Sequence, residues 1–190
     1  MKNDLDLRWF DLKKVLQDTD KKELINLIRD LYRLSEENRR YLFAGCMDPK
    51  TKPEILEAYR QIIKNEFFPK KGYGTLRYSI AKKAISDYSK ASGDFAGTME
   101  LMLFYVENGV GFTREYGDID EEFYDEIYTL FEEFCTRLKT PEGGTLYADF
   151  RERLFNIRRK TKGMGWGFGD GIKLRVNEIE EFFEEGQQDS

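Results

Sequence analysis

Residues 95–107 read FAGTMELMLFYVE, so a helix over this segment would carry apolar side chains almost all round. The carboxylate of Asp94 can cap the start of that helix, and Asn108-Gly109 offers a place for it to end. A helix without a polar face is stable only where other elements cover it on several sides. We therefore predict a central helix over residues 95–107, surrounded by amphipathic helices.

Apolar residues recur at helical spacing on both sides of this segment. The expected flanking helices cover about residues 5–17, 20–47 with a break near Ser35, 51–67, 79–92, 118–138, 146–161 and 172–183. Asp20, Ser79 and Asp118 are the expected N-caps of three of them. The segment 75–80 is the only weak strand candidate, and residues 184–190 are expected to form a frayed tail.

These patterns predict an all-α fold. The favoured arrangement is one compact bundle of seven or eight helices that forms a single domain over residues 1–190. A curved, HEAT-like stack of helix pairs is the alternative, although no sequence repeat of fixed period supports it.

The composition of the 190 residues suits a globular domain with a charged surface. Hydrophobic residues make up 40% of the chain, with 15 Phe, 11 Tyr and 2 Trp, and charged residues make up 35%. No apolar run approaches the roughly 20 residues that span a bilayer, and the first residues lack the apolar core of a secretory signal. Cys46 and Cys135 lie among apolar neighbours, which predicts buried free thiols in a reducing cytoplasm.

The chain contains no histidine. This absence removes the usual acid–base residue, the Ser-His and Cys-His nucleophile pairs, and histidine-ligated zinc or iron sites. The sequence therefore predicts no cofactor and no metal, and leans against an enzyme. A hard cation held by oxygens, or catalysis by carboxylates, stays as an alternative around residues 114–126.

The acidic cluster over residues 116–126 reads YGDIDEEFYDE. Its first acidic residues have the spacing of a calcium loop, but Phe123 stands where that loop needs glycine and Thr129 where it needs a bidentate glutamate. Acidic residues at a helix start also complement the free backbone N–H groups. Helix capping is the favoured interpretation.

The glycine-rich segment 163–171 matches neither a dinucleotide fingerprint nor a phosphate loop. A structural turn is the favoured interpretation, because alternating glycines permit sharp bends and close packing. A binding loop is the alternative, with Trp166 and Phe168 as contact residues. Arg114 and Tyr116, on the loop expected after the central helix, are two further candidates for ligand or partner binding.

Charge occurs in blocks: residues 64–90 carry a net +5, residues 91–135 a net −11, and residues 137–162 again +5. Self-paired or solvated faces are the favoured interpretation, since the overall pI is about 5.1. A basic face that binds an anion or nucleic acid is the alternative. The candidate anion-binding residues are Lys70, Lys71, Arg77, Lys82, Lys83, Arg158 and Arg159.

Several phrases of the sequence together resemble a known family. They are LYRLSEEN (31–38), EFFPK (66–70), AKKAISD (81–87), LMLFYVENGV (101–110), EYGDID (115–120) and GWGF (165–168). The family consists of small bacterial proteins of unknown function, and the resemblance spans about residues 12–183. It implies a bacterial cytoplasmic protein and supplies no activity, ligand or site residues.

Three functions remain open. The first is a non-catalytic helical interaction or adaptor module with an unidentified protein partner. The second is a nucleic-acid-associated accessory protein that uses the basic segments 64–90 and 137–162. The third is a histidine-free enzyme or carboxylate metal site around residues 114–126. The oligomeric state is left open by the sequence.

Overall fold

The structure is a computed structural model that describes residues 8–46 and 52–188, with side chains up to residue 185. Within these ranges the chain forms ten helices and no strands. The helices are α1 (Trp9–Asp18), α2 (Lys21–Leu34), α3 (Glu36–Cys46), α4 (Lys52–Phe67), α5 (Tyr78–Ser92), α6 (Phe95–Tyr116), α7 (Glu121–Leu138), α8 (Pro141–Gly144), α9 (Tyr147–Lys160) and α10 (Phe168–Gln188). The all-α prediction is confirmed, and the weak strand candidate at 75–80 lies in an irregular segment and the first turn of α5.

The number of helices is higher than the predicted seven or eight, for two reasons. Ser35 separates α2 from α3, because its extended backbone ends one helix while its hydroxyl accepts a hydrogen bond from the backbone N–H of Asn38. The segment at Pro141–Gly144, expected as a loop, forms one helical turn capped by Thr140. The break near Ser35 is confirmed, whereas the single turn of α8 is not revealed by the spacing of apolar residues.

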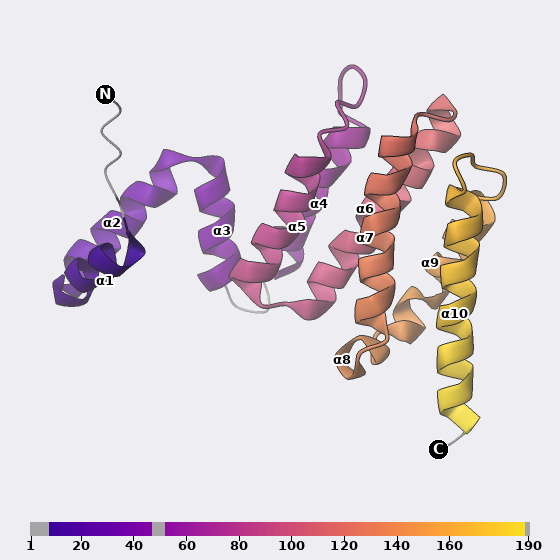
Figure 1. Cartoon of the computed structure of the whole chain (residues 1–190). Coiled ribbons are helices and arrows are strands. Elements are labelled where there is room, and N and C mark those ends of the chain that lie inside the picture. The colour runs from indigo at the N-terminus through magenta and orange to yellow at the C-terminus, as the bar shows by residue number, and fades with distance from the viewer. Residues whose placement is uncertain (1–7, 47–51, 189–190) are drawn as a thin grey trace.

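The helices form antiparallel neighbours that lie side by side, and α6 occupies the middle of the row (Figure 1). Helices α4 and α5 pack against α6 from one side, and α7 and α9 from the other. Helix α10 packs on α7 and α9 at one end of the row, and α2 and α3 extend the other end beyond α4 and α5. Thirteen of the 22 residues of α6 are buried, which confirms the prediction of a central apolar helix.

The predicted end of the central helix at Asn108-Gly109 is wrong, since α6 continues to Tyr116. The side chain of Asn108 donates to the carbonyl of Phe104 within the same helix, so it satisfies its donor without breaking the helix. Gly109 lies where α7 crosses, and a Cβ atom there would collide with the side chain of Ile127. The glycine therefore serves close helix packing, and Gly117, with a φ of +89°, ends the helix instead.

Two of the four predicted N-caps, Asp94 and Asp20, are confirmed. Asp94 accepts a hydrogen bond from the backbone N–H of Gly97 at 3.2 Å. Asp20 accepts hydrogen bonds from the backbone N–H groups of Lys22 and Glu23 at 2.7 and 3.0 Å. The predictions of Ser79 and Asp118 as caps are wrong. Arg77 holds the cap position of α5 without a side-chain capping bond, and Asp120 caps α7 by accepting from the N–H of Phe123 at 2.8 Å.

The C-terminal helix begins earlier than the apolar pattern indicates. Helix α10 starts at Phe168 and includes Gly169 and Gly171, which lie against the carbonyl of Thr161 and the ring of Tyr128. Side chains at these two positions would push α10 away from its neighbours. The helix runs to Gln188, through most of the segment expected as a tail, and residues 189–190 lie outside the described residues.

The two cysteines have different surroundings. Cys135 is a buried free thiol on α7, as predicted, and burial raises its pKa to about 12. The prediction for Cys46 is wrong, because this thiol is free but exposed at the end of α3. Across the described residues, no helix combines the length and the apolar character that a membrane crossing requires.

Candidate functional site

The most unusual surface of the molecule is formed by its first three helices. Helices α1, α2 and α3 contain no buried residue, although their sequences are rich in large apolar side chains. We call the exposed members of this set the N-terminal apolar surface. It consists of Trp9, Phe10, Leu12, Val15, Ile25, Leu27, Ile28, Leu31, Tyr32, Leu34, Tyr41 and Phe43.

This surface is exceptional within the molecule. Of the 18 large hydrophobic side chains that are exposed in the described residues, 12 belong to it. With about half of each side chain exposed, they present roughly 1,000 Å² of apolar surface in total. The largest apolar patch of an ordinary monomer is about 300–600 Å². The exposed apolar side chains of α1–α3 therefore make this surface the leading candidate site.

A groove between α2 and α3 lies within the N-terminal apolar surface. Its volume is about 360 Å³, and its walls are almost entirely apolar. Ile25, Ile28 and Tyr32 line it from one face of α2, because positions three and four apart in a helix share a face. Leu42, Phe43 and Cys46 line it from α3. The groove is therefore an open, mainly apolar depression, which Arg29 also lines.

The position of this site follows from how α1–α3 attach to the rest of the chain. Helix α3 packs on α5 and α4, which leaves its Leu42 and Phe43 side toward α2 and the groove. Helix α2 packs mainly on α3, and its apolar side chains Ile25, Leu27, Ile28, Leu31, Tyr32 and Leu34 remain exposed. In Figure 1, α1 and α2 extend away from the other helices as an arm.

Sequence reasoning missed this site because it assigned α1 and α2 to the core. Helical periodicity shows that one face of a helix is apolar, but not which molecule covers it. One signal was available in α2, where apolar residues spread over more than a narrow stripe: Leu24, Ile25, Leu27, Ile28, Leu31, Tyr32 and Leu34. Such a wide apolar face is typical of a helix that packs against more than one other element.

A second candidate surface lies at the end of the molecule where three loops meet (Figure 1). The loop after α6 contacts the loop before α10, since the N–H of Gly165 donates to Asp118 at 3.4 Å. Arg114 donates to the carbonyl of Lys160 at 3.4 Å. The ring of Tyr116 lies 5.9 Å from that of Tyr73, on the loop after α4. The structure thus brings Arg114 and Tyr116 next to the glycine-rich turn.

The two residues predicted as contacts in the glycine-rich segment differ in exposure. Trp166 is 62% exposed and has a φ of +55°, a left-handed conformation that is costly for a bulky residue. Phe168 is buried, and its ring packs 4.9 Å from that of Tyr124. Phe168 therefore belongs to the core, and the prediction that it is a surface contact is corrected.

Most of the predicted anion-binding residues are paired with carboxylates of the same chain. Lys82 pairs with Glu126, Lys83 with Glu37 and Asp87, Arg77 with Glu66, and Arg158 with Glu180. Lys70 and Lys71 are exposed on the loop after α4, and Arg159 donates to Asn156 at 2.9 Å. These charges are thus mostly self-paired, as the favoured interpretation expects, although, of these pairs, only Lys82–Glu126 joins a basic block to the acidic block 91–135.

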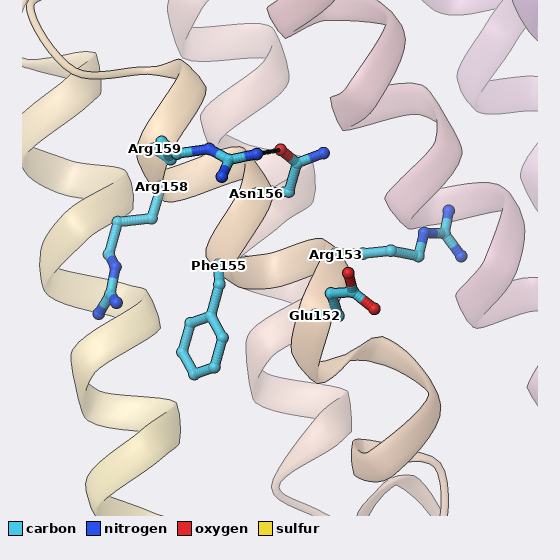
Figure 2. A pocket seen from close by; sticks show the side chains of 6 residues that line it. All are labelled: Glu152, Arg153, Phe155, Asn156, Arg158 and Arg159. Atoms are coloured by element: carbon cyan, nitrogen blue, oxygen red, sulfur yellow. Dashed lines mark hydrogen bonds between the residues drawn. The ribbon is translucent and has the colours of Figure 1, made fainter.

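Figure 2 shows that the arginines of α9 do not converge on a single point, although they line a surface cavity of about 550 Å³. Arg158 points toward α10, where it donates to Asn177 at 2.8 Å. Arg153 points to the opposite side and binds Glu107 of α6. Between them, the ring of Phe155 lies 4.9 Å from the Arg158 guanidinium. Arg153 and Arg158 thus connect α9 to α6 and α10, respectively.

The carboxylates of the acidic cluster also have structural roles. Asp118 accepts from the hydroxyl of Tyr124 and from the N–H of Gly165, Asp120 caps α7, and Glu126 pairs with Lys82. In the part of the chain that the structure describes, no three acidic or cysteine side chains gather as metal ligands would. The capping interpretation therefore accounts for the geometry of this cluster, with Asp120 as the cap.

The pair between Arg77 and Glu66 gives a testable pH dependence. Glu66 is buried, which disfavours its charge, but hydrogen bonds from Arg77 and Thr75 outweigh the burial and hold its pKa below the ordinary value. A carboxyl whose folded pKa is lowered stabilises the fold above its unfolded pKa of about 4.3. That contribution is lost as the pH falls through the lower folded value.

We expect Glu66→Gln to lower the free energy of unfolding at neutral pH, and the difference from wild type to shrink as the pH falls below about 4.3. Urea denaturation at a series of pH values measures this difference. Glu181→Gln, at an exposed position of α10, is the matched control and should show no such trend. A Glu66→Gln difference that is constant or grows with acidity would contradict the role of this pair.

Comparison with known proteins places the chain in a family. Residues 7–183 match the family described as "Family of unknown function (DUF6155)", which is nearly the whole chain. The protein belongs to this family. The matched region includes α1–α3, so the arm lies within the segment that this family member shares with the family. No curated protein and no solved structure matches the chain.

Proposed function

We propose that this member of the family is a non-catalytic helical interaction module that binds another polypeptide through α1–α3. The observation that carries the proposal is the N-terminal apolar surface, with its roughly 1,000 Å² of exposed apolar side chains. A standard protein–protein interface buries about 800 Å² per partner. The exposed area is therefore enough for a specific and stable complex.

The anatomy of the surface also supports binding to a polypeptide. Trp9, Tyr32 and Tyr41 are of the residue types that most often dominate the binding energy of interfaces. Charged side chains lie among the apolar positions: Arg29 pairs with Asp30 and Arg39 with Glu36, each within its own helix. An apolar centre with a charged rim is the usual composition of a protein interface.

The main body of the molecule can act as the rigid support of such a module. Its core joins α4–α10 around α6, and none of that core comes from the arm. The two other functions inferred from the sequence have less support. Most of the basic candidates are already paired with acids, and Asp118, Asp120 and Glu126 form hydrogen bonds or an ion pair within the fold.

A photo-crosslinking amino acid placed at Ile28 tests the proposal in cells that naturally contain the protein. Ile28 lines the groove and is 48% exposed; Leu174 on α10 is 56% exposed and provides a matched control position. We expect light to produce a discrete crosslinked polypeptide complex from position 28 and none from position 174. A chain that forms no crosslinked complex from position 28, or equal amounts from both positions, would contradict the proposal.

A further inference from the structure

We infer that the polypeptide that covers the N-terminal apolar surface is a second copy of this chain, so that the protein is a symmetric dimer joined through α1–α3. The inference rests on the proposed function, since it names the partner of the same surface. Three features of α1–α3 carry it: the area, the shape of the two complementary parts, and the charge.

The first feature is the area. Two copies that buried this surface against each other would remove roughly 2,000 Å² of apolar side-chain area from water. Total buried areas from about 2,000 Å² upward are typical of permanent homodimers, whose interfaces are also more apolar than those of transient complexes. Helices α1–α3 offer this area without any contribution from α4–α10.

The second feature is that the surface contains both a groove and a helix that can fill it. The groove between α2 and α3 is about 360 Å³ in volume. Helix α1 presents Trp9 and Phe10, which are 66% and 63% exposed and have the size of side chains that anchor in such grooves. In a symmetric dimer, α1 of each copy would enter the groove of the other, so one surface serves both sides of the interface.

The third feature is the charge of the surrounding segment. Residues 1–63 carry a net charge of +1, compared with −11 for residues 91–135. Two copies of an almost neutral segment can approach without strong repulsion, whereas two copies of the acidic segment could not. A near-neutral surface also offers little attraction to a strongly acidic or basic partner. The charge therefore favours a second copy over a partner of high charge.

Sedimentation velocity and light scattering of the purified full chain test the dimer. We expect wild type to have twice the 22.5 kDa mass of the chain. Ile28→Asp places a carboxylate in the groove and should weaken association by about 100-fold or more, giving a monomer at micromolar concentration. Leu174→Asp, at a similarly exposed position outside the surface, should remain a dimer. Helix α2 contributes no residue to the buried core, so Ile28→Asp should keep the helix content of wild type.

The exposed thiol of Cys46 gives an independent readout, because it lines the groove while Cys135 is buried. We expect Cys46 to react slowly with a thiol reagent in wild type and in Leu174→Asp, and at least ten times faster in Ile28→Asp. A wild-type monomer with a freely reactive Cys46 at high concentration would overturn the dimer. The inference would also be overturned if Ile28→Asp remained a dimer while its Cys46 reacted freely, because the dimer contact would then lie elsewhere.

These outcomes separate the dimer from the proposed function. If the purified chain is a monomer but position 28 crosslinks to a different polypeptide in cells, the dimer is wrong and the interaction module stands. If the chain is a monomer and position 28 crosslinks to nothing, both are wrong. If the crosslinked product has twice the mass of the chain and contains only its peptides, both are supported.

Discussion

Phe134→Ala is expected to lower the free energy of unfolding by about 3–5 kcal/mol. Phe134 lies on α7 and is fully buried. Its ring stacks on Phe131 of the same helix and meets the edge of Phe150 of α9, with ring centres 5.3 Å apart. Truncation would remove contacts to both rings and leave a cavity between α7 and α9 that rigid helices can only partly close.

The measurement for this prediction is chemical denaturation followed by circular dichroism, with the midpoint and the slope reported separately. Phe182→Ala is the matched control, because Phe182 is 45% exposed on α10. We expect the control to lose about 1 kcal/mol or less. A loss at Phe134 that is no larger than the loss at Phe182 would show that α7 and α9 do not share the packed core described above.

Arg153→Met is expected to cost about 1–3 kcal/mol of unfolding free energy. The Arg153 guanidinium donates two hydrogen bonds to Glu107, at 2.9 and 2.7 Å, and a further bond to Glu100. Glu100 in turn pairs with Arg60 of α4 at 2.6 Å, so the network connects α4, α6 and α9. All four side chains are mostly buried, and their remaining exposure screens the charges and keeps the cost below that of a fully buried pair.

A double-mutant cycle with Glu107→Gln isolates the Arg153–Glu107 interaction, because the double variant leaves neither charge of that pair without its partner. We expect the sum of the two single losses of unfolding free energy to exceed the loss in the double variant by about 1 kcal/mol. Arg159→Met, two turns later on the exposed side of α9, is the control and should cost about 0.5 kcal/mol or less. Additive losses in the cycle would mean that the network contributes no net coupling between α6 and α9.

The parts of the fold that the sequence predicted well are those that local composition determines. The segment 95–107 could only be central, because no face of it is polar. The cap at Asp20 and the break at Ser35 follow from short polar side chains beside apolar repeats. The all-α class follows from helical spacing in every segment.

The incorrect predictions depend on neighbours far away in the chain. Gly109 looked like a helix end, but its role is set by Ile127, on the helix that crosses it. Phe168 looked like a surface anchor because the turn before it is rich in glycine, yet Tyr124 and Tyr128 cover it. The paired charges, such as Arg153 with Glu107, are 46 residues apart. No single-sequence pattern encodes these contacts.

The candidate site shows most clearly that some features depend on contacts between distant segments and not on local sequence. The apolar repeats of α1 and α2 predicted helices with one buried face, and the helices are present. Whether a face is covered by the same chain or by another depends on where the helix attaches to the rest of the fold. Because α2 packs mainly on α3 and leaves most of its apolar side chains exposed, the structure was needed to recognise the N-terminal apolar surface.

The fluorescence of Trp9 provides the most direct measurement of whether α1–α3 form the interface of a dimer. The chain has two tryptophans, so Trp166→Phe leaves Trp9 as the only one. In this variant we expect a blue-shifted emission that resists quenching by acrylamide at high protein concentration. The emission should shift to the red and quench readily on dilution or after Ile28→Asp. A red, freely quenched Trp9 at every concentration would contradict the dimer interface.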